Sequence, residues 1–240
     1  MKKAAHILTA MLVMASTLFT SCNSDEPTPT TEVFGTFVTY EGATELSKDW
    51  NLTFTTREEN DSPLVTFTWS SKAEPDKNLV KGERYLITYT NASQQRYASG
   101  SITLMQILQI FNGKVTPKPL SEIKDMQKDP YRILLTERSG QWVNLIGVAP
   151  FNVLPKTFCL FVDEATINSS IPDVYVGYVS DTNSATISDK ELYGSFDLAP
   201  VWNLPTCKGI KLHYSTTSGE TSKTFLRNNG PLTPTPDPGE

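Results

Sequence analysis

The chain has 240 residues, with 26 acidic against 21 basic side chains and a net charge of −5. No cluster of Lys and Arg is present in it, which excludes a protein that follows a nucleic acid backbone. Without its terminal segments the chain leaves about 200 residues to fold, which predicts two domains, with one large sandwich as the alternative.

Residues 1–21 have the features of an export signal. Lys2 and Lys3 form a basic start and residues 7–19 form an apolar core. This core is shorter than the roughly 20 residues that a membrane-spanning helix needs. The run Leu18-Phe19-Thr20-Ser21-Cys22 resembles the lipobox of bacterial lipoproteins, although Phe19 stands where Leu is commonest. That resemblance implies cleavage before Cys22 and acyl chains on its thiol as the contact with the membrane; ordinary secretory cleavage after Ser21 is the alternative.

Residues 22–32 are predicted to form a tether. Ser24, Asp25 and Glu26 place two carboxylates just after the lipid, and residues 27–31 alternate Pro with Thr, which favours an extended spacer. The acidic stretch resembles the export signal of Bacteroidetes surface lipoproteins. It implies an outer membrane lipoprotein that faces the cell exterior, whereas a solvated acidic linker is the alternative. The Pro-rich residues 229–240 are expected to be a disordered tail.

Residues 33–113 are predicted to form an OB-like five-stranded barrel, since apolar and polar side chains alternate along several short segments. The change of parity between Leu104 and Ile107 predicts a β-bulge near Met105 and Gln106. The predicted strands are residues 33–40, 50–55, 65–69, 84–90 and 101–110. Four aromatic side chains of these strands could stack on a ligand, but the alternation assigns them first to the core: Trp50, Phe54, Phe67 and Trp69.

Residues 114–130 are polar and contain three prolines, so they are predicted to be the linker between domains, with one helical turn at 121–127. Residues 131–228 are predicted to form a β-sandwich, because strand patterns recur there at regular intervals. Its seven predicted strands are residues 131–136, 141–148, 157–162, 174–180, 191–198, 209–216 and 221–226. The fold class is therefore all-β, an N-terminal OB-like barrel followed by a C-terminal β-sandwich.

Three segments resemble the NigD-like lipoproteins of Bacteroidetes: Phe34–Tyr40, Lys81–Tyr89 and Ile210–Tyr214. The resemblance implies an OB domain joined to a β-sandwich and a link to bacteriocin operons. It supplies no catalytic or ligand-binding residue, because the family has no established site.

Two pairs of residues are candidates for a special role in the second domain. Cys159 and Cys207 could form a disulfide in an exported protein, whereas Cys159 could instead be a buried thiol in an apolar strand. Trp142 and Trp202 are the candidates for stacking on a ligand. Trp202 lies in a predicted loop among prolines, where a large ring could equally well plug the end of the sandwich.

Catalytic patterns are missing from the sequence. Removal of residues 1–21 leaves His213 as the single histidine, and strand alternation predicts that it faces solvent beside Lys211 and Ser215. No Gly-x-Ser-x-Gly motif or phosphate-binding glycine loop is present. Glu58-Glu59 and Asp163-Glu164 are neighbours in sequence, so on a strand they point to opposite faces. We therefore expect no enzyme, no cofactor and no metal, which needs about four ligands.

The function expected from these features is that of a surface-displayed, non-enzymatic lipoprotein of the cell envelope with a binding or bacteriocin-associated accessory role. Two alternatives stay open, a glycan-binding accessory lipoprotein of a polysaccharide-uptake system and a pilus or adhesin subunit. The expected partner is a protein or a glycan rather than a nucleic acid, and the sequence does not identify it.

Overall fold

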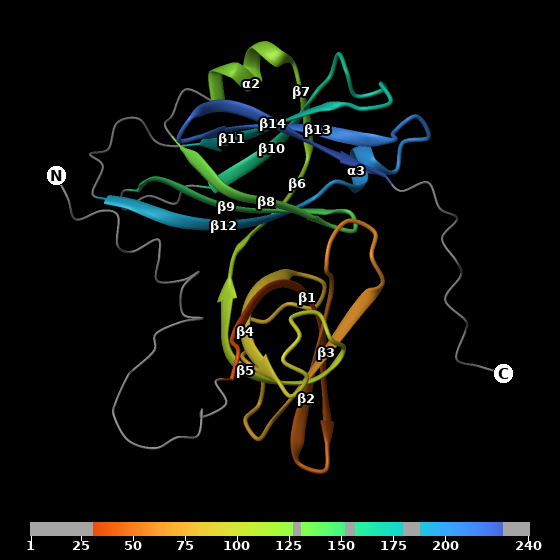
Figure 1. Cartoon of the computed structure of the whole chain (residues 1–240), viewed down its shortest axis with the longest axis vertical. Coiled ribbons are helices and arrows are strands. Elements are labelled where there is room, and N and C mark those ends of the chain that lie inside the picture. Colours follow the sequence, from red (N-terminus) through yellow and green to blue (C-terminus); the bar gives the residue numbers. More distant parts are fainter. Residues whose placement is uncertain (1–30, 127–130, 152–156, 180–187, 228–240) are drawn as a thin grey trace, which may run out of the picture. The chain divides into compact units, whose positions relative to one another are not determined.

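A computed structural model describes residues 31–126, 131–151, 157–179 and 188–227 (Figure 1). The chain divides into two compact units, the first made of residues up to Thr56 with Val65–Gln109 and the second of Arg57–Leu64 with the residues from Ile110 onward. The boundary thus lies before the predicted linker, at Gln109. Several predicted features lie outside the described residues: the signal peptide, Cys22, Ser24, Asp25, Glu26, most of the tether, and the tail at 229–240.

The first unit contains a closed β-barrel with the strand order β1-β2-β3-β5-β4. Its strands are β1 (Phe34–Leu46), β2 (Asp49–Arg57), β3 (Leu64–Ser71), β4 (Arg84–Asn91) and β5 (Gly100–Gln109). β1 pairs antiparallel with β4 and β3 pairs parallel with β5, which closes the sheet. The predicted all-β class and the five-stranded OB-like barrel are confirmed.

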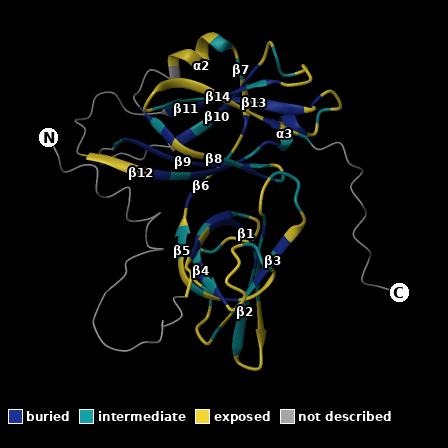
Figure 2. Ribbon diagram, viewed as in Figure 1, coloured by how far each residue is buried: buried dark blue, intermediate teal, exposed yellow. Residues whose placement is uncertain are grey.

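Alternation along the strands builds the barrel core. Leu52 and Phe54 on β2, like Val65 and Phe67 on β3, are buried while the residues between them are more exposed (Figure 2). The predicted bulge is confirmed, since Thr88 pairs with Gln106 and Tyr89 pairs with Leu104, which leaves Met105 as the extra residue. Because the bulge shifts the parity, Leu104 and Ile107 both pack against the core cluster of the barrel.

The second unit is made of two sheets with the strand orders β14-β13-β11-β10-β7 and β6-β12-β9-β8. Their bounds are β6 (Phe111–Lys114), β7 (Thr116–Lys118), β8 (Arg132–Ser139), β9 (Trp142–Phe151), β10 (Thr157–Asp163), β11 (Asp173–Val179), β12 (Ser188–Asp197), β13 (Gly209–Thr216) and β14 (Gly219–Leu226). Helix α2 (Leu120–Met126) contacts β10 and β11, and the short helix α3 (Ala199–Trp202) follows β12.

The segment predicted as the linker, residues 114–130, begins with ordered strand structure in β6 and β7. β6 pairs parallel with β12, β7 pairs parallel with β10, and Val115 between them is buried in the second core. The residue pattern did not predict these two strands because Gly113 and Pro117 lower the strand propensity of their segments. Pro117 is tolerated in β7 because this strand lies at the edge of its sheet. Gly113 is required because a Cβ there would lie 2.7 Å from the ring of Phe196.

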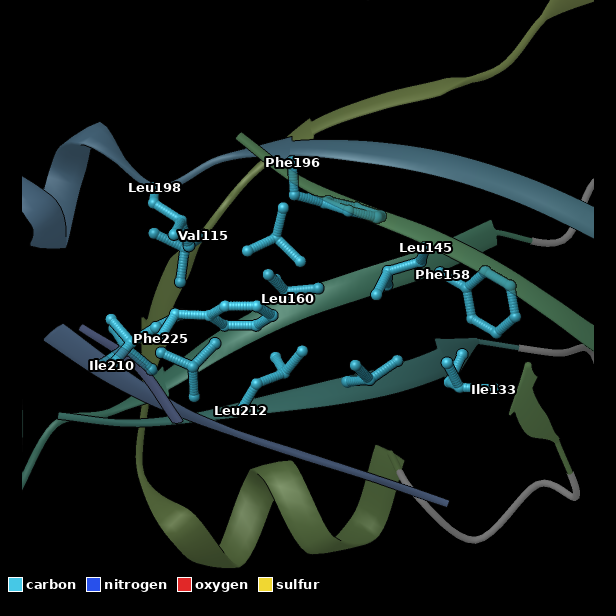
Figure 3. Packing of buried hydrophobic residues seen from close by; sticks show 14 of the residues in the cluster. Val115, Ile133, Leu145, Phe158, Leu160, Phe196, Leu198, Ile210, Leu212 and Phe225 are labelled. Carbon is cyan, nitrogen blue, oxygen red and sulfur yellow. The ribbon is translucent and has the colours of Figure 1, made fainter. Parts of the chain in front are cut away.

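The core of the second unit lies between its two sheets. Figure 3 shows Leu145 and Phe196 from one sheet facing Leu160, Leu212 and Phe225 from the other. These five side chains are at most 5% exposed, as expected where the inner faces of two sheets interdigitate in a sandwich.

Buried tyrosines in this core keep their hydroxyl groups bonded. Tyr131 donates to the carbonyl oxygen of Val176 and Tyr178 donates to that of Pro150, both at 2.7 Å. The two rings therefore add apolar area without leaving an unsatisfied polar atom.

Candidate ligand-binding groove

Trp202, one of the two tryptophans predicted as stacking candidates, plugs the sandwich. It ends helix α3, is only 5% exposed and belongs to the core of the second unit. The guanidinium carbon of Arg138 lies 4.4 Å from its ring centroid, and Asp61 accepts two hydrogen bonds of 2.7 Å from that guanidinium. With the core on one side and Arg138 over the ring, Trp202 has no face left for a ligand.

Trp142, the other candidate, begins strand β9 and is half-buried. It pairs with Asp197 of β12 and with Ser139 of β8 across the sheet. Neither of the two hollows described below includes Trp142 in its wall.

The two cysteines are free thiols, so the candidate disulfide is not formed. Cys207 is buried, and its Sγ donates to the carbonyl oxygen of Gly209 at 3.3 Å. Cys159 is half-buried, and burial raises the pKa of its thiol. A raised pKa lowers the fraction of reactive thiolate, as is typical of a structural cysteine.

His213 corrects a second prediction, because it is not simply solvated. Its Nε2 lies 2.6 Å from Oδ1 of Asp173, and its ring stacks on Tyr175 with centroids 4.5 Å apart and planes at 11°. Burial raises the pKa of Tyr175, and the charges of Asp173 and Asp163 raise it further. Within the described residues no hydroxyl or thiol is hydrogen-bonded to His213, so the His–Asp pair has no nucleophile beside it.

No group of three or more His, Cys, Asp or Glu side chains in the described residues is placed to hold a metal ion. Among the same residues, no helix is both long and apolar enough to cross a membrane.

The first unit contains a hollow of about 370 Å³ that we call the barrel groove. Its wall comes from strands β2 to β5 and from the segment between β3 and β4. The lining residues are Leu52, Trp69, Ser71, Ala73, Glu74, Pro75, Asp76, Asn78, Leu79, Tyr85, Ile107 and Gln109. A volume of this size lies within the range of sites for small molecules, about 300–1,000 Å³.

The floor of the barrel groove is aromatic and aliphatic. Trp69 is half-buried: it packs against the barrel core and also lines the hollow. Leu79 and Ile107 likewise pack on the core and line the same hollow. The floor is thus supported from behind, and its side chains do not need to be ordered by a ligand.

The segment 72–83 forms one wall and is fixed by several hydrogen bonds. The hydroxyl of Tyr85 accepts from the backbone N–H of Val80 at 2.8 Å and donates to the carbonyl oxygen of Asn78 at 3.3 Å. Oδ1 of Asp76 accepts from the N–H of Asn78 at 2.9 Å, and the N–H of Leu79 donates to the carbonyl oxygen of Asp76 at 2.9 Å. This wall is therefore largely formed before any ligand arrives.

The rim of the barrel groove carries acidic and neutral polar groups. The lining residues include two carboxylates, Glu74 and Asp76, and two amides, Asn78 and Gln109, but no Lys, Arg or His. Within the described residues the side chains of Glu74 and Gln109 make no hydrogen bond or ion pair, so both are open to a ligand.

A second hollow, of about 400 Å³, lies in the second unit and is lined in part by Tyr131, Pro150 and Thr217. An ion pair between Arg132 and Asp189, 3.4 Å apart, joins two of its lining residues. Since the hydroxyl of Tyr131 is already bonded within the core and its ring is 9% exposed, this hollow lacks the aromatic face that the barrel groove has.

Sequence patterns named Trp69 among four aromatic side chains that could stack on a ligand but assigned it first to the core, and they did not identify Glu74 or Gln109. The position of Trp69 in its strand could have indicated a ligand site. Trp69 is the last large residue on the inward-facing side of β3, so it lies at an end of the barrel rather than in its middle.

No family model matches the chain, and no curated protein matches its sequence. Solved structures do resemble it. A DUF1344 protein of unknown function from Bacteroides vulgatus has a TM-score of 0.61 at 16% identity, with 85% of this chain and 93% of that chain covered. A NigD-like immunity protein from Bacteroides caccae has a TM-score of 0.52 at 14% identity, with 82% and 99% covered.

A candidate lipoprotein from Bacteroides fragilis also has a TM-score of 0.52, at 11% identity, with 83% of this chain and 99% of that chain covered. The TM-scores establish a likeness of fold over nearly the whole length of each neighbour, and identities this low establish nothing beyond the fold. The resemblance to the NigD-like lipoproteins, drawn from three sequence segments, is thereby confirmed at the level of the fold.

Proposed function

We propose that the chain is a non-enzymatic lipoprotein of the cell envelope that binds its partner through the barrel groove. The observation that carries the binding role is the groove itself, with an aromatic floor held by the core and unpaired polar side chains on its rim. The non-enzymatic part is supported by the described His–Asp pair, which has no nucleophile bonded to it.

The envelope address is supported by the lipobox-like run that ends at Cys22 and by the fold shared with a candidate lipoprotein of Bacteroides fragilis. Acyl chains anchor by burial of methylene groups, each contributing about 0.8 kcal/mol, so more than one chain holds a protein firmly. The outer membrane and the exterior face are the finer parts of this proposal, and they rest on Asp25 and Glu26.

Fractionation of cells tests the address. Replacing Cys22 by Ala should move the protein from the membrane fraction to the soluble fraction, because the acyl chains are its proposed anchor. Replacing Asp25 and Glu26 by Ala should retain lipidation but remove the accessibility to protease on whole cells. Membrane association of Cys22→Ala would contradict the anchor, and unchanged accessibility of the double variant would contradict the export signal alone.

A bacteriocin-associated accessory role is the finer functional alternative, supported by the fold shared with a NigD-like immunity protein. It predicts that deletion of the gene makes cells sensitive to the bacteriocin of their own strain. A deletion strain that resists as well as its parent would remove this alternative and leave the envelope address unaffected.

A further inference from the structure

We infer that the barrel groove binds a neutral saccharide. This assignment rests on the proposed function, in which the groove is the binding site, and it adds the chemical class of the ligand. It is carried by three properties of the described residues: the floor, the rim and the charge of the wall.

The floor suits a ring with one flat apolar face. A pyranose ring exposes C–H groups on one face and hydroxyl groups along its edge, so it can lie on an indole while its edge remains polar. Trp69 supplies the indole, and Leu79 and Ile107 extend the apolar area beside it. Because Trp69 is fixed by the core, stacking costs little side-chain entropy.

The rim suits hydroxyl groups rather than anions. Glu74 and Asp76 present carboxylate oxygens that accept from hydroxyls, while Asn78 and Gln109 present amides that both accept and donate. OB barrels elsewhere bind oligonucleotides or oligosaccharides. The lining residues include no Lys, Arg or His to pair with phosphate, which disfavours the first of these classes here.

The segment 72–83, which supplies one wall, has no net charge, which argues against a cationic ligand. Between β3 and β4 the chain carries three acidic and three basic side chains: Lys72, Glu74, Asp76, Lys77, Lys81 and Glu83. Because the charges of this segment sum to zero, the segment as a whole does not attract a positive ligand. A neutral ligand rich in hydroxyl groups satisfies the rim without a charge.

Titration of the mature chain tests this assignment. The protein is the full mature chain with Cys22→Ser, which avoids lipidation, and tryptophan fluorescence or calorimetry reports binding. The probes are neutral trisaccharides of glucose, xylose and N-acetylglucosamine, with trilysine and a trinucleotide as charged probes. We expect at least one neutral trisaccharide to bind saturably, and neither charged probe to bind.

Variants locate the binding. Trp69→Ala should weaken the Kd at least about tenfold, equivalent to about 1.4 kcal/mol, while Trp50→Ala is the matched control because Trp50 packs on the same core and does not line the groove. The double variant Glu74→Ala and Gln109→Ala should weaken binding to a similar extent without removing any core contact.

Absence of binding by every trisaccharide, binding of trilysine or the trinucleotide in their place, or sugar binding unchanged by the double variant would each overturn the assignment. The fractionation of Cys22→Ala is independent of these outcomes, so a failure of the ligand class is distinguishable from a failure of the envelope address.

Discussion

The guanidinium of Arg138 provides a quantitative test of how the second unit is held together. Its side chain is fully buried, while that of Asp61, its partner at 2.7 Å, is 28% exposed. Arg138 also donates to the carbonyl oxygens of Gly140 at 2.6 Å and Leu226 at 3.1 Å and covers the ring of Trp202. The two ends of this ion pair should therefore respond differently to removal.

Replacing Asp61 by Ala leaves a buried cation with two carbonyl partners and an aromatic ring. Loss of one partner of a buried pair costs about 3–5 kcal/mol, and because Arg138 keeps its other partners we expect a loss of about 3 kcal/mol. Replacing Arg138 by Met instead leaves a carboxylate that water can reach, together with two unpaired carbonyls, for which we expect about 2 kcal/mol. The double variant should also cost about 2 kcal/mol, far less than the sum of the two single changes.

The assay is urea unfolding of the mature Cys22→Ser chain, followed by tryptophan fluorescence. The matched control is Asp189→Ala, because Asp189 pairs with Arg132 at 3.4 Å with both side chains about half exposed, and such pairs contribute about 0–1 kcal/mol. The reasoning is refuted if Asp61→Ala costs no more than Asp189→Ala, or if the double variant is additive.

Two further changes test the packing. Burial raises the pKa of Tyr89 from 10.0 to about 12, so the stability that its neutral hydroxyl contributes is present below pH 10 and is lost as the pH rises toward about 12. Tyr89→Phe should reduce this alkaline loss of unfolding free energy by about 1.4 kcal/mol per pH unit, measured by urea unfolding from pH 9 to 12. A pH profile of stability that does not change in the variant would contradict this expectation. Gly147→Ala should destabilise the second unit by about 1–3 kcal/mol, because the new Cβ would lie 2.7 Å from Phe158 Cζ and 3.0 Å from a backbone oxygen. Gly35→Ala, whose Cβ meets nothing within 4 Å, is its control, and equal losses in the two variants would show that crowding at Gly147 has no effect.

Strand alternation was sufficient to predict the barrel, because its period of two directly reports which face is buried. It even located the bulge at Met105, since an extra residue changes the parity of everything that follows. Alternation could not reveal β6 and β7, which are short and interrupted by Gly113 and Pro117. Their strand geometry is imposed by pairing with β12 and β10, and these contacts lie far away in sequence.

The roles of the tryptophans were harder to predict for a similar reason. Whether Trp202 plugs a core or faces a ligand depends on Arg138, which lies 64 positions earlier in sequence. The barrel groove depends on the path of the segment 72–83 across the end of the barrel, fixed by Tyr85. Local composition does not encode such contacts, so neither Glu74 nor Gln109 could be identified before the fold was known.

The barrel groove as the ligand site of the chain can be tested without knowledge of its natural ligand. The four tryptophans give four indole N–H signals in a proton–nitrogen correlation spectrum of the ¹⁵N-labelled mature chain, and single Trp→Phe variants assign them. A library of uncharged small molecules should give hits that shift the signal of Trp69 while those of Trp142 and Trp202 stay in place. Hits that shift Trp142 or Trp202 and leave Trp69 unchanged would contradict the central claim.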